Sequence, residues 1–140
     1  DLVALIDSAM TTLDVEGEEF SDTYSTGVVN AVARAASRGV TVHVVIANGQ
    51  LDATSVNRVK NAGAHVVMTG PSSGNGTMTN PYIHAKAIVA DSTRGFVGSE
   101  NFSGGSLGYN RELGVMFDTA AEVAKVKAAI DGDFARGTPQ

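Results

Sequence analysis

The feature that most constrains the fold is a unit of helix, glycine and strand that occurs twice in the first half of the chain. The two units comprise residues 26–38, Gly39 and 40–47, and residues 51–62, Gly63 and 64–68. In each unit, apolar residues recur at helical spacing, a glycine ends the helix, and a valine-rich run typical of a buried strand follows. Helices that alternate with buried strands predict βαβ units on a parallel sheet.

The rest of the chain extends this pattern. Apolar residues at helical spacing predict amphipathic helices at 1–12 and 120–134. Further strands are expected at 13–20, 82–90, 95–98 and 111–117. We therefore predict an α/β fold with a mainly parallel mixed sheet and helices on both faces. No linker or low-complexity segment divides the chain, so we expect one domain over residues 1–140.

The composition excludes several classes of protein. The chain has 140 residues and no cysteine, which excludes disulfides, thiolate zinc sites and a cysteine nucleophile. No apolar run approaches the roughly 20 residues that a membrane-spanning helix needs. The net charge of -5 leaves no broad basic face for non-specific binding of nucleic acid. An anionic substrate must therefore be held by a few local groups.

Two short motifs carry the candidate chemistry. A stretch of turn-forming residues, 70–81, leads into the predicted strand that holds His84 and Lys86. Residues two apart on a strand share a face, so the imidazole and the ammonium group are expected to point the same way. Ser99 and Asn101, again two apart, bring a hydroxyl and a carboxamide on the adjacent segment. Together these residues supply a nucleophile or base and several groups that can hydrogen-bond anionic oxygens.

This pattern resembles the signature of the phospholipase D superfamily, which is His-x-Lys, four residues, Asp, six residues and Gly-Ser-x-Asn. The specified positions are filled by His84, Lys86, Asp91, Gly98, Ser99 and Asn101. The order of elements is also similar, from the Ile-Asp-Ser-Ala helix to the segment Asn-Arg-Glu-Leu-Gly-Val-Met-Phe. The chain is most similar to one half of bacterial phospholipase D-like and cardiolipin synthase-like proteins, which carry two such halves.

The resemblance implies a reaction through a covalent intermediate. His84 would attack phosphorus and form a phosphohistidine, which water or an alcohol then displaces. Lys86 and Asn101 would hold the non-bridging oxygens, with Ser99 assisting. Neutral imidazole, with an unperturbed pKa of about 6.5, is a competent nucleophile without a metal. No set of residues has metal-ligand spacing, so we expect neither a metal nor another cofactor.

An in-line displacement also needs a proton donor beside the leaving group, and one His84 cannot flank both sides of phosphorus. His43 and His65 lie in valine-rich strands with no lysine two positions later, and we interpret them as structural. A second motif is therefore expected from a homodimer partner or from another half of a longer chain. The start at Asp1, without methionine and inside a helical pattern, favours a piece of a longer chain.

Further residues are candidates for supporting roles. Glu112 matches the family position whose carboxylate bonds the far ring nitrogen of the nucleophile, and the alternative is a surface ion pair with Arg111. Asp91 and Gly98 are interpreted as structural, with Asp91 capping backbone amides of the turn that it begins. Glu19 and Arg111 are candidate contacts for a substrate hydroxyl or head group, and the alternative is that they are solvated.

Three functions stay open at this point. The leading hypothesis is a phosphodiesterase or phosphatidyltransferase that acts on phospholipids or other phosphodiesters. The second is a metal-independent endonuclease of the same superfamily, which the acidic charge balance disfavours. The third is a non-catalytic or interaction half-domain, and the intact motif argues against it.

Overall fold

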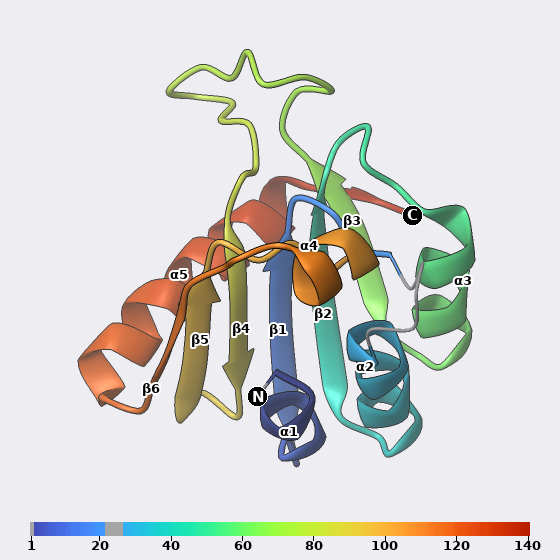
Figure 1. Ribbon diagram of the computed structural model, residues 1–140, viewed down its shortest axis with the longest axis vertical. Coiled ribbons are helices and arrows are strands. Elements are labelled where there is room, and N and C mark those ends of the chain that lie inside the picture. The colour runs from blue at the N-terminus through green and yellow to red at the C-terminus, as the bar shows by residue number, and fades with distance from the viewer. Residues whose placement is uncertain (1, 22–26) are drawn as a thin grey trace.

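The computed structural model describes residues 2–21 and 27–140. These residues form one sheet with strands in the order β6-β5-β4-β1-β2-β3-β7 (Figure 1). The strands are β1 (Thr12–Gly17), β2 (Thr41–Ala47), β3 (His65–Thr69), β4 (Lys86–Ala90), β5 (Arg94–Gly98), β6 (Gly114–Phe117) and β7 (Thr138–Pro139). The helices are α1 (Leu2–Asp7), α2 (Val28–Ser37), α3 (Ala53–Asn61), α4 (Gly104–Tyr109) and α5 (Ala120–Arg136).

Strands β1, β2 and β3 run parallel, with α2 and α3 between them along the chain. They are the two predicted βαβ units, and the predicted α/β fold with a mixed sheet is confirmed. The pairs β1–β4, β4–β5, β5–β6 and β3–β7 are antiparallel, so parallel pairing is confined to one half of the mixed sheet, and the expectation that the sheet is mainly parallel is wrong. The connections explain this division. A loop rather than a crossover helix follows β3, and a short turn joins β4 to β5, which requires an antiparallel pair.

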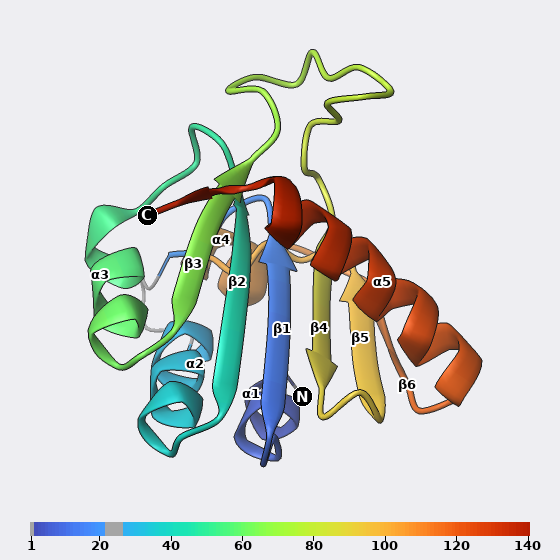
Figure 2. The same cartoon turned by 180° about the vertical axis from the view of Figure 1, so that it is seen from behind.

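The helices cover both faces of the sheet. Helices α1 to α4 lie on the face seen in Figure 1, and α5 crosses the opposite face in Figure 2. The apolar core on the first face includes Ile6, Val32 and Val44. The core beneath α5 is smaller and joins Val123 and Ile130 to residues of β2, β3 and β4. Both faces of the sheet are therefore buried over most of its width, as expected for an α/β sandwich.

Glycines end two of the helices as the sequence predicts. Gly39 after α2 has φ 89° and Gly63 after α3 has φ 110°, a conformation that glycine adopts without the steric cost of a Cβ atom. The predicted start of α2 lies outside the described residues. Helix α3 begins at Ala53 rather than at residue 51, because the Asp52 side chain accepts hydrogen bonds from the amides of Thr54 and Ser55 as an N-cap.

Several elements are shorter than predicted. Strand β4 begins at Lys86, not at residue 82, because its partner β1 ends at Gly17 directly opposite. Residues 82–85 therefore have no neighbouring strand there to pair with. Strand β6 likewise begins at Gly114 rather than at residue 111, opposite the last residue of β5. At the start of the chain, α1 ends at Asp7 instead of near residue 12, since β1 already begins at Thr12.

Candidate active site

The sheet register brings the motif residues to one edge. Gly17 at the end of β1 pairs with Lys86 at the start of β4. Gly98 at the end of β5 pairs with Gly114 at the start of β6. The segments that follow β1 and β5 and precede β4 and β6 therefore meet at the same end of the sheet. The long loop between β3 and β4 projects from this end in both views (Figures 1 and 2).

His84 and Lys86 converge on a third residue, Glu18. His84 Nε2 lies 3.3 Å from Glu18 Oε2, and Lys86 Nζ donates to the same oxygen at 3.0 Å. The two side chains differ in exposure, since that of His84 is 73% exposed and that of Lys86 is 2% exposed. His84 lies outside β4, so the common direction of the pair comes from this shared carboxylate and not from a continuous strand.

The buried ammonium group of Lys86 is fixed by two hydrogen bonds. Its Nζ donates to Glu18 and, at 2.9 Å, to the main-chain carbonyl of His84. An ammonium group has three donors, so these two bonds leave one donor for a ligand. Partial burial raises the pKa of Glu18, but hydrogen bonds from Lys86 and Tyr82 and the nearby positive charges outweigh it, so the pKa lies below its usual value. Glu18 is therefore ionised at neutral pH.

Ser99 and Glu112 are brought together. The Ser99 hydroxyl donates to Glu112 Oε2 at 2.6 Å, and Ser106 donates to Oε1 at 2.5 Å. These bonds lower the pKa of Glu112, and the positive charge of Lys86 adds to the effect. Across the described ranges, Glu112 makes no hydrogen bond to His84 and no ion pair with Arg111. The structure thus differs here from both contacts that the sequence led us to expect.

Asn101 lies beside this pair through the start of α4. Its backbone amide donates to the Ser106 hydroxyl at 2.9 Å, and the same hydroxyl donates to Glu112. The side-chain oxygen of Asn101 is buried, and no described residue hydrogen-bonds it. Buried polar atoms in folded proteins nearly always have a partner, so this carboxamide is well placed to bind a ligand.

Gly98 makes room for its neighbours in the site. A Cβ atom at this position would collide with the Glu100 carboxylate and the Phe96 ring. Gly114, its partner across the sheet, has the same two neighbours. The glycine of the motif is therefore required by packing.

Asp91 lies at the opposite end of β4 from the site. Its carboxylate accepts hydrogen bonds from the backbone amides of Met10, Thr11 and Thr12 at 2.7 to 3.1 Å. Partial burial raises the pKa of Asp91, but the bonds to these amides outweigh it and hold the pKa at about 2. Asp91 thus caps the amides between α1 and β1 rather than those of its own turn.

The other two histidines lie on the α5 face. His43 Nδ1 is 3.2 Å from Asp14 Oδ1, and its ring stacks on Phe134 with 4.3 Å between centroids. The centroids of the His43 and His65 rings are 5.9 Å apart. Neither ring belongs to the set of contacts around Lys86. The chain therefore supplies only His84 to the candidate site.

Glu19, Arg111, Tyr82 and Glu18 complete the surroundings of the site. Glu19 is half-buried and Arg111 is exposed. The Tyr82 hydroxyl donates to Glu18 Oε1 at 2.9 Å. The roles of Glu18 and Tyr82 are not visible in the sequence, because only the antiparallel pairing of β1 with β4 brings these residues together. No local pattern in the sequence predicts that pairing of β1 with β4.

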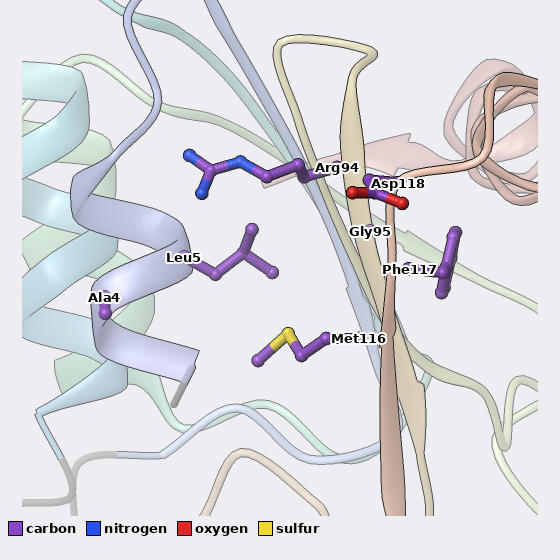
Figure 3. Close-up of a pocket in the computed structure, with 7 residues that line it drawn as sticks. All are labelled: Ala4, Leu5, Arg94, Gly95, Met116, Phe117 and Asp118. Atoms are coloured by element: carbon purple, nitrogen blue, oxygen red, sulfur yellow. The ribbon is translucent and has the colours of Figure 1, made fainter.

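A separate pocket of about 330 Å³ lies between α1 and the β5–β6 edge (Figure 3). It is lined by Leu5, Met116 and Phe117, with Arg94 extending from β5 toward α1. Arg94 begins β5, whereas the motif follows the end of that strand. The pocket holds no motif residue and is distinct from the candidate active site.

The comparisons with known proteins identify the family. A family model described as "Cardiolipin synthase, PLD-like domain" matches residues 2–134. The chain belongs to this family. It is thereby a member of the phospholipase D superfamily, as the motif predicts, and has a fold of phosphodiesterases. No curated protein matches the chain.

Solved structures share the phospholipase D fold. Nuc from Salmonella typhimurium, a phospholipase D family member, superposes with a TM-score of 0.80 at 19% identity, over 99% of this chain and 88% of Nuc. NucT from Helicobacter pylori gives a TM-score of 0.82 at 19% identity, over 99% and 88% of the two chains. TrmBL2, an archaeal chromatin protein described as binding DNA, gives 0.65 at 12% identity, over 99% of this chain and 48% of its own. At these sequence identities the structural similarity shows a shared fold only.

The described residues include neither a membrane-spanning helix nor a cluster of metal ligands. No helix among them is long and apolar enough to cross a membrane. No group of three or more His, Asp or Glu side chains in residues 2–21 and 27–140 is arranged to hold a metal ion.

Proposed function

We propose that this chain supplies half of an active site that cleaves or transfers phospholipid phosphodiesters. The observation that carries the proposal is the contact of exposed His84 and buried Lys86 with one anionic oxygen, that of Glu18. A substrate phosphate needs a similar pairing of an accessible nucleophile with a fixed cation. Asn101 lies beside the Ser99–Glu112 pair, and its side-chain NH2 group supplies donors of the kind that a phosphate oxygen accepts.

In the proposed reaction, a ring nitrogen of His84 attacks phosphorus, and the bond from phosphorus to the leaving alcohol oxygen breaks. The alcohol takes a proton from a second histidine on the opposite side. Water or an acceptor alcohol then attacks the phosphohistidine, giving up its proton to that second histidine and releasing His84. Lys86 and Asn101 bind the non-bridging oxygens throughout, and no step requires a metal.

We assign Glu112 the role of positioning Ser99. Its two carboxylate oxygens bind the hydroxyls of Ser99 and Ser106, which ties the segment after β5 to α4. The Ser99 oxygen also accepts a bond from the Leu113 amide at 3.1 Å. Ser99 gives its only proton to Glu112 and accepts from this amide, so it has no donor left for a phosphate oxygen. It assists by holding the segment that carries Asn101 in one position.

The second histidine is proposed to come from another copy of the motif, in a dimer or in a second half of a longer chain. The residues that follow the site support this. Leu113 is 85% exposed and Val115 is 62% exposed, on and before the edge strand β6. Tyr109 and Met116 are also exposed. Leu113 and Val115, two exposed apolar residues two positions apart at the start of an edge strand beside an incomplete site, favour a protein partner there.

The charges near the site favour a lipid over a nucleic acid. Glu18, Glu19, Glu100 and Glu112 lie on the segments that form it, against Lys86 and Arg111 as cations. A polyanion would have to approach all of these carboxylates, whereas a single phosphodiester meets mainly Lys86. DNA is kept as the second candidate substrate because TrmBL2, with a similar fold, is described as binding DNA.

A direct assay separates the candidates. Fluorescent phospholipid in mixed micelles and plasmid DNA are offered side by side, with a chelator and without, to the wild-type chain and to His84→Ala. We expect lipid turnover by the wild type only, unchanged by the chelator and rising per chain with protein concentration as dimers form. Cleavage of DNA alone would favour the endonuclease, and no turnover of either would favour a non-catalytic half.

A further inference from the structure

Glu18 occupies a position that the proposed mechanism does not use. Its Oε2 lies 3.0 Å from Lys86 Nζ and 3.3 Å from His84 Nε2, where a phosphate oxygen would also have to bind. Its Oε1 accepts a hydrogen bond from the Tyr82 hydroxyl at 2.9 Å. Both oxygens of this carboxylate are therefore engaged within the site.

The backbone around Glu18 is held as firmly as its side chain. A Cβ atom on Gly17 would lie 2.9 Å from the Phe102 ring. Phe20 is fully buried and pairs with Leu51 and Phe102 in isolated bridges. The side chain of Glu18 is itself only 15% exposed. A carboxylate fixed on both sides in this way does not swing out to solvent without breaking these contacts.

A phosphodiester bound to Lys86 and His84 therefore comes into contact with the Glu18 carboxylate. Two anionic oxygens in contact repel each other, most strongly where water is excluded. The contact becomes favourable when a hydrogen-bond donor lies between them. Tyr82 already donates to Oε1 and Lys86 to Oε2, and the remaining donor of Lys86 is needed for the phosphate itself. Among the described residues, no further donor apart from the proposed nucleophile His84 faces this carboxylate, so the donor that we consider is on the substrate.

We infer that Glu18 is a specificity-determining residue that accepts a hydrogen bond from the alcohol part of the substrate. This inference rests on the proposed function and narrows its substrate class. It selects phosphodiesters whose alcohol carries a free hydroxyl or ammonium group close to phosphorus, such as glycerol or ethanolamine esters. A simple alkyl ester and the DNA backbone have no such donor and leave the carboxylate facing the phosphate.

The test compares two lipids with the same acyl chains and the same charge. Phosphatidylglycerol carries head-group hydroxyls, and phosphatidylmethanol carries none. The protein variants are Glu18→Gln, which keeps the shape but removes the charge and one acceptor oxygen, and Glu122→Gln as the control, the same change at an exposed position of α5 away from the site. The readouts are kcat/KM for each lipid and calorimetric binding of the dihexanoyl forms of both.

We expect the wild type to prefer phosphatidylglycerol by about tenfold or more in kcat/KM and in binding, as for the loss of one charge-assisted hydrogen bond. Glu18→Gln should reduce this preference to near one, and Glu122→Gln should keep it. If Glu18→Gln lowers kcat/KM by the same factor for both lipids, Glu18 only holds Lys86 and His84 in place. If it raises kcat/KM by the same factor for both, Glu18 only competes with the phosphate.

The calorimetric binding measurement tests the role of Glu18 independently of the proposed function. If the wild type turns over neither lipid, the proposed function fails, and the ratio of the two binding constants still decides the role of Glu18. A ratio that is the same in the wild type and in Glu18→Gln overturns the inference even when turnover is observed. Binding of neither lipid overturns both proposals.

Discussion

Lys86 Nζ donates a hydrogen bond to the main-chain carbonyl of His84, two residues earlier in the chain. The buried cation thereby fixes the backbone of the proposed nucleophile, which otherwise lies outside any strand. The same ammonium group also binds Glu18. The position of His84 thus depends on a lysine that is itself held by the fold.

His84→Ala should abolish turnover of any phosphodiester, because the other two histidines, His43 and His65, lie on the α5 face away from this site. The measurement is steady-state turnover together with a search for phosphorylated protein after acid-free quenching. His65→Ala, an exposed change on the α5 side of the sheet, is the control and should retain activity. Full activity in His84→Ala would refute the mechanism.

Lys86→Met should lower turnover by about a hundredfold or more, as for removal of a preorganised donor. It should also lower the free energy of unfolding, because the largely buried carboxylate of Glu18 loses its cation. The double variant with Glu18→Gln should recover part of the stability but not the turnover. Urea unfolding and turnover of the two variants check this, and recovery of both would show that Lys86 only neutralises Glu18.

Glu112→Gln should lower turnover by about tenfold and leave the fold intact, since the amide keeps the shape of the side chain. What is lost is the anionic acceptor that binds the hydroxyls of Ser99 and Ser106. Turnover and circular dichroism are the measurements, with Glu122→Gln on the exposed side of α5 as the control. An unchanged turnover would remove Glu112 from the site.

Asp91→Asn should destabilise the protein by about 2 kcal/mol, because a charged acceptor of backbone hydrogen bonds is lost. The pKa of Asp91 is about 2 in the folded chain, below its usual value of 3.8. Its stabilising contribution is therefore present above pH 4 and is lost as the pH falls through about 2. Urea unfolding at pH 7 and at acidic pH should show a difference between wild type and variant that shrinks on acidification.

Glu16→Gln should have the opposite pH dependence. Glu16 is 3% exposed, and burial, together with the charge of Asp133, raises its pKa from 4.5 to about 7. Between pH 4.5 and about 7, the folded state binds a proton that the unfolded state has lost. The contribution of Glu16 to the free energy of unfolding is therefore greatest below pH 4.5 and declines as the pH rises through about 7. The wild type should lose stability relative to Glu16→Gln between pH 5 and pH 8 in urea unfolding. Asp118→Asn, an exposed change, should follow the wild type.

Local sequence patterns were sufficient for much of the fold. Gly39 and Gly63 end helices because a residue with positive φ stops the helix, and this requirement is visible in the sequence itself. The valine-rich runs are buried on both faces in β2, which their composition already implies. The motif around His84 and Lys86 likewise identifies the superfamily, because its residue types and spacing are fixed by chemistry.

The tertiary structure decided what the site residues touch. Glu18 and Lys86 are 68 positions apart, and only the antiparallel register of β1 with β4 joins them. The same register sets the start of β4 and leaves His84 outside the strand. Glu112 binds Ser99 and Ser106 because the pairing of β5 with β6 brings the segments on either side of α4 together, a contact with no periodic signal in the sequence. Local patterns indicate which residues are buried and where turns occur. Strand pairing depends instead on the free energy of the whole sheet, which cannot be inferred from any single segment.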